Sequence, residues 1–304
     1  MKDLIDLLKE AQRDPWGFFA KHKLRDLLVL CHPDKNPGNP QATYYFTEFS
    51  AAFERTKTEP LMFGSYRATN HLCDGDLRSI YVSDDNIVKV PLVESRSANK
   101  LAKKEADMLA MLAEKSKGLS YKLYFPKLVK SFTHEKKLVN VTTHSQSLVS
   151  LAELLGKFQN GIDGRHIGWM TKRLLSGIGY VHHTGYVHGA ITPEHILFSL
   201  ANHGIVFTGW IHSEKIGDKI KTIPASRRAL YPDFAKDGLT PKVDTSMIGR
   251  SMALLADDKC PRRLRNFLKG ISMGLNDSAW DLEDSLKEIL KDSYGAPKFV
   301  ELTV

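Results

Sequence analysis

The chain has little cysteine and no long apolar run. Its 304 residues include three cysteines, Cys31, Cys73 and Cys260, which lie far apart in the sequence. An odd number of scattered cysteines argues against a disulfide framework, and a structural zinc site needs clustered ligands. No run approaches the roughly 18 apolar residues of a membrane span, and the first helix has no apolar core of signal-peptide length. We therefore expect a soluble protein of a reducing, cytoplasmic compartment, with no metal and no membrane partner.

Acidic residues are fewer than basic ones, 35 against 43, which gives a net charge of +8. Residues 1–60 contain nine of each sign, so the surplus lies entirely in 61–304 and is densest over 95–140. Nucleic-acid readers usually add aromatic stacking platforms to such charge, and few aromatic residues lie in this stretch. We expect a solvated charged face there, with an acidic partner as the alternative, and no nucleic-acid partner.

The length and composition indicate about two folded domains. Apolar residues make up 42% of the chain and charged residues 26%, which is ordinary for globular proteins. Thr58-Glu59-Pro60 is the predicted boundary, which separates a domain of residues 1–59 from one of residues 60–304.

The first sixty residues have the apolar spacing of three helices. A short first helix ends near Asp14. A second run, residues 16–30, has to end before Pro33, because proline lacks an amide hydrogen and disfavours helix at the preceding residue. After a loop of residues 32–40, aromatic side chains recur every three or four residues over 45–53, which predicts a third helix.

The tripeptide His32-Pro33-Asp34 follows a basic helix and precedes a helix that carries Phe46 and Phe49. This helical hairpin resembles the J-domain of DnaJ-type co-chaperones over residues 1–59. The resemblance implies that His32, Pro33 and Asp34 engage a DnaK-type chaperone and stimulate its ATP hydrolysis. No Gly/Phe-rich linker and no Cys-x-x-Cys-x-Gly repeat follows, so the chain does not resemble a full-length DnaJ.

Basic side chains on the second helix of that family steer it to an acidic face of the chaperone. Lys21, Lys23 and Arg25 match this role, although a solvated helical face is the alternative interpretation. Asp26 adds a negative charge to the basic face, and Leu30 replaces a common lysine. We therefore expect docking to be weaker than is usual for the family.

Residues 60–304 have a strand-rich part followed by a helical part. Alternating patterns predict strands near 66–72, 77–82 and 87–90, a helix over 97–115, and strands near 128–132 and 137–142. From residue 148 onward the pattern is mainly helical. This order resembles the bilobal protein-kinase fold over about residues 62–295. The predicted fold class is therefore α+β, with an all-α J-domain followed by a kinase-like domain.

The pattern of that family's catalytic loop can be traced in the sequence, but the residues that phosphoryl transfer needs are replaced. Residues 188–197 occupy the place of the kinase pattern His-Arg-Asp-Leu-Lys-Pro-Glu-Asn-Ile-Leu, with His188 retained. Ala190 replaces the aspartate that accepts the hydroxyl proton, Gly189 the arginine and Thr192 the lysine. His195 replaces the asparagine that binds a second magnesium ion, and neutral imidazole is a poor ligand for that cation.

The Asp-Phe-Gly element has two possible registers, and neither contains a carboxylate. One is Phe207-Thr208-Gly209, and the other, which we prefer, is Gly209-Trp210-Ile211, because it leaves residues 205–207 as the preceding strand. With the base and both metal ligands absent, the resemblance implies a pseudokinase.

Several scaffold positions of the family are retained. Lys89 matches the lysine of the third strand, Glu105 its helix partner, and Asp244 the residue that holds the catalytic-loop backbone. Lys89 and Glu105 are either a structural ion pair or a remnant of nucleotide binding without metal. We expect no cofactor.

The hypothesis from the sequence is a co-chaperone that is not an enzyme. Its J-domain would recruit a DnaK-type chaperone, and its catalytically inactive kinase-like domain would bind a protein partner or client. One alternative is an unorthodox active kinase that uses Lys89, with Glu194 as the only acid near the loop. Another is an interaction adaptor whose J-domain does not function.

Overall fold

The structure is a computed structural model that describes residues 2–57, 59–144, 147–257 and 260–302. Its contacts divide the chain into two compact units. The first contains residues 1–99 and 129–144, and the second contains residues 100–128 and 145–304. Helices and strands are both present, which confirms the predicted α+β class. The predicted domain boundary includes Thr58, which lies outside the described residues.

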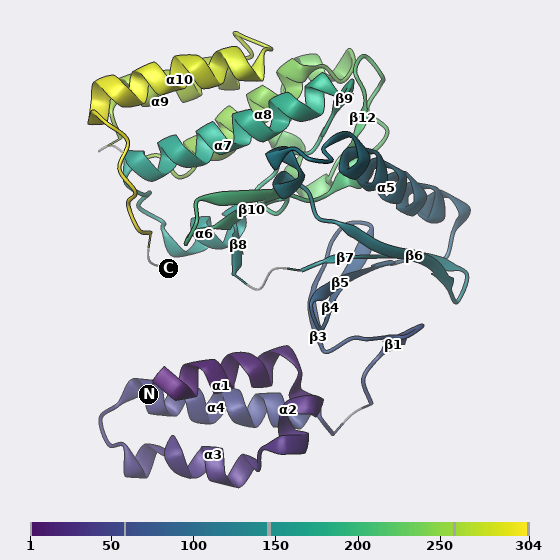
Figure 1. The fold of residues 1–304 in the computed structure, drawn as a ribbon, viewed down its shortest axis with the longest axis vertical. Helices are drawn as coiled ribbons and strands as arrows, with labels where there is room; N and C mark the ends of the chain where they lie inside the picture. The colour runs from purple at the N-terminus through teal and green to yellow at the C-terminus, as the bar shows by residue number, and fades with distance from the viewer. Residues whose placement is uncertain (1, 58, 145–146, 258–259, 303–304) are drawn as a thin grey trace. The chain divides into compact units, whose positions relative to one another are not determined.

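The N-terminal region of the first unit is helical (Figure 1). Its elements are α1 (Lys2–Arg13), α2 (Pro15–Lys21), α3 (Leu24–Leu30), the 3-10 helix η1 (Pro33–Lys35) and α4 (Pro40–Arg55). Their apolar faces form a core of their own around Phe18 and Phe49, which are stacked with ring centroids 6.2 Å apart. The first and third predicted helices are thus confirmed.

The predicted continuous helix over residues 16–30 is wrong, because the chain breaks at His22 and Lys23. Both residues have extended backbone angles, and α2 ends where they begin. Phe18 and Leu27 are nine residues apart, which would place them on opposite faces of one straight helix. The break turns α3 so that both side chains are buried in the same core.

The rest of the first unit is a β-sheet. The strands β3 (Asn70–Asp74), β4 (Arg78–Ser83), β5 (Asn86–Pro91), β7 (Lys137–Thr143) and β6 (Leu128–His134) lie side by side in that order. Val88, Val139 and Val141 are buried on one face, as the alternating pattern predicts. The predicted strand over 66–72 is interrupted, since β2 (Tyr66–Arg67) pairs with β1 (Met62–Phe63) and β3 starts only at Asn70.

The second unit is mainly helical (Figure 1). It contains α5 (Arg96–Lys115) from Lys100 onward, α6 (Leu151–Lys157), α7 (Gly164–His183), α8 (Pro241–Ala253), α9 (Arg262–Ser272) and α10 (Ala279–Tyr294). Helices α7 and α8 are buried around most of their circumference, as expected for central helices. One hydrophobic core runs from α5 to α10.

Short elements between α7 and α8 carry the predicted catalytic loop. They are β9 (Tyr186–Val187), β10 (Ile196–Ser199), β11 (Gly204–Phe207), η3 (Trp210–His212), β12 (Glu214–Lys215), η4 (Ala225–Leu230) and η5 (Asp233–Lys236). Strand β10 pairs antiparallel with both β11 and β8 (Leu148–Ser150), and β9 pairs antiparallel with β12. In the described part of the chain, none of the helices combines the length and hydropathy that a membrane span requires.

The break after α2 yields a stability prediction. Replacing Phe18, which is fully buried, by alanine should destabilise the N-terminal helices by about 3 kcal/mol, because the cavity cannot collapse between packed rings. Hydrogen exchange of the α1 and α4 amides should become about a hundredfold faster. Val29→Ala, at an exposed position of α3, is the control, and equal rates in the two variants would contradict the shared core.

Candidate functional site

The loop between β9 and β10 is held by the carboxylate of Asp244, which is fully buried in α8. One carboxylate oxygen accepts a hydrogen bond from the backbone N–H of His188 at 2.7 Å, and the other from that of Gly189 at 2.8 Å. The first oxygen also lies 3.0 Å from Nε2 of His182, on α7. Asp244 therefore has the loop-holding position that the sequence predicts for it.

His188 is fully buried in this loop, with a partner for each ring nitrogen. Nδ1 accepts a hydrogen bond from the backbone N–H of Ala190 at 3.2 Å, and Nε2 donates to the carbonyl of Thr208 at 2.7 Å. Because Nδ1 accepts while Nε2 donates, the two bonds together require the neutral ring with its proton on Nε2. Burial lowers the pKa of His188 to about 4, although the nearby Asp244 carboxylate opposes this shift.

The loop offers no carboxylate where a proton acceptor would be needed. Ala190 is fully buried, and its carbonyl lies 3.0 Å from Nδ1 of His195. Gly189 has a positive φ of 73°, and a Cβ atom there would lie 2.8 Å from the carbonyl oxygen of His212. The backbone thus leaves no space for the arginine that the family pattern would place at residue 189.

A side chain is also excluded at Gly209, where the preferred register would place the metal-binding aspartate. Strand β11 ends at Phe207, which agrees with that register. Gly209 has a φ of 80°, and a Cβ atom there would lie 2.6 Å from the ring of His195. The histidine therefore fills space beside the backbone that an aspartate at 209 would require.

Trp210 follows Gly209 and is fully buried. Its ring lies edge-on to His188, with centroids 4.5 Å apart, and its indole N–H donates to the carbonyl of Phe207 at 2.8 Å. Next to it, burial lowers the pKa of His212 to about 3, and its Nδ1 lies 2.9 Å from the hydroxyl of Thr222. This part of the site is packed with neutral aromatic and imidazole rings.

Two contacts of the loop have no counterpart in the sequence prediction. The hydroxyl of Tyr231 donates to the carbonyl of Gly189 at 2.7 Å, and burial raises the pKa of this tyrosine. Arg250 of α8 donates to the carbonyl of Tyr231 at 3.0 Å. In the sequence, Tyr231-Pro232-Asp233 resembles the Ala-Pro-Glu element of kinases, which does not predict this hydrogen bond. No sequence signal identifies Arg250, because it acts through the backbone of a distant segment.

Glu194 has an arginine partner. It forms an ion pair with Arg227 of η4. Burial raises the pKa of Glu194, but the hydrogen bonds and the positive charge that stabilise its carboxylate, those of Arg227 foremost, together outweigh burial and lower the pKa overall. The acid that the kinase alternative requires is therefore ionised and bound to an arginine.

Lys89 and Glu105 are both buried, with 7% and 1% of their surface exposed. Lys89 belongs to β5 in the first unit and Glu105 to α5 in the second. Their pairing stays a prediction. Among the described residues, no group of three or more His, Cys, Asp and Glu side chains is arranged to bind a metal ion.

Comparison with known proteins identifies the fold. No family model matches the chain, and no curated protein matches it significantly. Among solved structures, the kinase domain of PF14_0431 matches with a TM-score of 0.56 at 16% sequence identity, over 66% of this chain and 67% of that one. The chain has a protein-kinase-like fold. At this identity, the match supports the architecture and not an activity.

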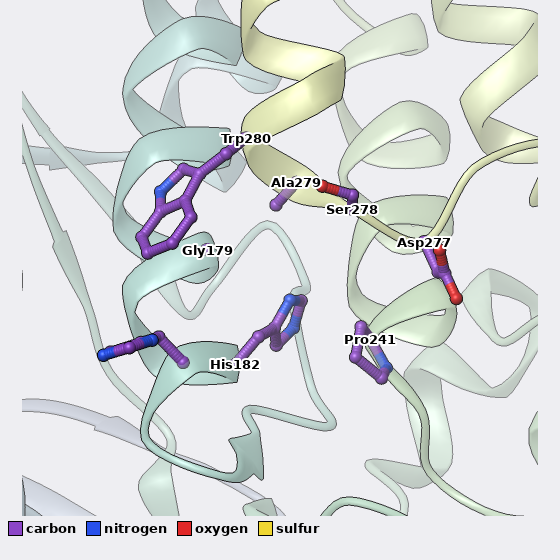
Figure 2. A pocket seen from close by; sticks show the side chains of 8 residues that line it. Gly179, His182, Pro241, Asp277, Ser278, Ala279 and Trp280 are labelled. Carbon is purple, nitrogen blue, oxygen red and sulfur yellow. The ribbon is translucent and has the colours of Figure 1, made fainter.

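A cavity of about 260 Å³ lies in the helical part of the kinase-like fold, away from His195 and Gly209. Figure 2 shows it between α7, the start of α8 and the start of α10, with Trp280 beside Gly179. The absence of a side chain at Gly179 makes room for the indole, since a Cβ atom there would lie 2.5 Å from its nitrogen. His182 lines this cavity and also contacts Asp244.

The other predicted site is the loop between α3 and α4. Nδ1 of His32 accepts a hydrogen bond from the backbone N–H of Asp34 at 3.1 Å, and its ring lies edge-on to Phe46. The side-chain amide of Asn36 donates to the carbonyls of Leu30 and His32. Pro33 begins η1, and the side chain of Asp34 is 89% exposed. Hydrogen bonds within the loop therefore fix its conformation, and the carboxylate of Asp34 is exposed to solvent.

Lys21, Lys23 and Arg25 are all exposed. Because the helix breaks between Lys21 and Leu24, they lie around the break and not along one continuous helix face. Sequence periodicity alone placed them on one face.

The buried histidines of the kinase-like fold predict acid sensitivity. Their folded pKa values lie below the ordinary value of 6.5, so the unfolded chain takes up protons that the folded chain cannot. Their stabilisation is complete above pH 6.5 and decreases as the pH falls toward 4. Between pH 7.5 and pH 5, His188 and His212 should each lower the free energy of unfolding by about 2 kcal/mol.

Denaturant unfolding at the two pH values measures this loss. His212→Gln should reduce the difference between pH 7.5 and pH 5, whereas His71→Gln, at an exposed position of β3, should leave it unchanged. Equal stability of the native sequence at both pH values would contradict the assignment of neutral, buried rings.

Proposed function

We propose that the protein is a co-chaperone whose N-terminal helical region acts as a J-domain toward a DnaK-type chaperone. The observation that carries this proposal is the loop His32-Pro33-Asp34 between two helices. Its histidine is fixed by Phe46 and the Asp34 N–H, and its aspartate is exposed. A rigid loop with an exposed carboxylate can bind a cationic side chain of a partner without an ordering cost.

The kinase-like part would then serve as a binding domain with no phosphoryl-transfer activity. Phosphoryl transfer needs a carboxylate near the substrate hydroxyl and ligands for magnesium. Ala190, Gly209 and His195 supply neither, and backbone geometry at residue 209 opposes restoring an aspartate. We infer that it binds a protein partner or client.

A second candidate is an adaptor whose J-domain does not function. The break between α2 and α3 favours it, because Lys21 and Arg25, which are four residues apart and would share a face of one continuous helix, lie on separate helices. Electrostatic steering by a dispersed set of charges is weaker than by one patch. The two candidates differ in whether the protein stimulates the ATPase of a DnaK-type chaperone.

Chaperone ATPase stimulation distinguishes them. The intact protein should raise the single-turnover ATPase rate of a DnaK-type chaperone severalfold, and His32→Gln should abolish the increase. His71→Gln, which changes an exposed histidine outside the helical region, should behave as the native protein does. Binding without stimulation, or equal stimulation by His32→Gln, would refute the co-chaperone role.

The kinase alternative predicts phosphate incorporation that Lys89→Met abolishes. We expect no incorporation from labelled ATP with magnesium or manganese, either into the protein itself or into a generic substrate. We expect the same for the double variant Ala190→Asp, Gly209→Asp, because His195 occupies the space beside residue 209. Activity of the native protein that Lys89→Met removes would contradict the proposal.

A further inference from the structure

Glu214 is a buried carboxylate held by two lysines. It lies on β12, shortly after Trp210, and is 5% exposed. One oxygen accepts a hydrogen bond from Lys104 at 2.7 Å, and the other from Lys221 at 2.7 Å. The carboxylate therefore has a cationic donor on each oxygen, which offsets the cost of its burial.

The two lysines come from different parts of the chain. Lys104 belongs to α5 and precedes Glu214 by 110 residues in the sequence. Lys221 lies after β12, in the segment that leads to η4. Burial lowers the pKa of Lys104 against the opposing effect of Glu214. The cluster thus connects α5 with residues 214–221 through a buried carboxylate and a half-buried lysine, with the exposed Lys221 as the second cation.

The same region is connected to the loop that Asp244 holds. Glu214 faces Val187 in the pairing of β12 with β9, and His188 follows directly. The backbone N–H of Ile216 donates to the carbonyl of Gly185 at 3.1 Å. Lys115, near the end of α5, donates to the carbonyl of Thr184 at 3.2 Å. Helix α5 is therefore attached to Thr184, just before β9, and to Glu214 on the strand that pairs with β9.

We propose that Glu214, Lys104 and Lys221 form a permanent clamp that keeps the segment after Trp210 ordered and α5 attached to it, without phosphorylation of the segment. In regulated kinases, a phosphoryl group on the corresponding segment forms such contacts with basic side chains, and its removal releases the segment. Here the carboxylate is part of the sequence, so the ordered state is the resting state. The inference concerns the kinase-like fold and is independent of the co-chaperone proposal.

The hydroxyl groups of the segment distinguish the clamp from a switch that depends on phosphorylation. Thr222 contacts His212, and Ser226 is exposed beside Arg227. A phosphoryl switch would act through one of them. The clamp requires neither, so Ser226→Ala, which removes only an exposed hydroxyl, should leave the order of the segment unchanged.

Limited proteolysis of the full chain with trypsin tests the clamp. The segment offers cleavage sites after Lys215, Lys219 and Arg228, which are exposed. Lys104→Met should increase the rate of cleavage between residues 215 and 228 at least tenfold, because it leaves one oxygen of a buried carboxylate without its cation. Hydrogen exchange of residues 212–222 should accelerate in parallel. Lys104→Arg, which keeps the cation, should retain protection.

The matched control is Lys103→Met, which removes an exposed lysine of the same helix whose partner is Asp107. It should leave both rates as in the native protein. Equal rates in Lys104→Met and Lys103→Met would overturn the clamp. So would native protein that becomes as susceptible as Lys104→Met after phosphatase treatment, because a phosphoryl group would then hold the segment.

Discussion

The hydrogen bonds from the backbone of His188 and Gly189 to the buried carboxylate of Asp244 fix the loop on which the kinase-like unit is centred. A charged acceptor with no access to water must have all its donors in place, so this contact sets the backbone of the loop. The ring of His188 packs against Trp210, and the hydroxyl of Tyr231 donates a hydrogen bond to the carbonyl of Gly189. The backbone of this loop is thus held from several sides, while Ala190 and Gly209 carry no carboxylate.

Packed rings and internal ion pairs surround this loop. His188, His195 and Trp210 fill the centre of the site, where their packing excludes the side chains that phosphoryl transfer would use. Around this centre, the buried Glu214 is paired with two lysines and Glu194 with Arg227.

Local patterns in the sequence predicted much of this structure, and long-range contacts were beyond them. Pro33 predicted the end of α3 and alternation predicted the strands, while the resemblance to the kinase pattern implied the loop at His188 and the role of Asp244. The break at His22 was missed, because the apolar spacing of residues 16–30 suits one helix until Phe18 and Leu27 must share a core. Arg250 and Glu214 were missed because their partners are backbone carbonyls or lysines far along the chain.

The central claim is that the two halves of the chain have separate binding roles, with the first directed by the His32 loop. Affinity capture from the native cell with the intact protein and with His32→Gln tests it most directly. The account predicts that a DnaK-type chaperone is recovered with the native protein and lost with His32→Gln, while a second set of proteins is recovered with both. Equal recovery of the chaperone with both forms, or its absence from both, would contradict the account.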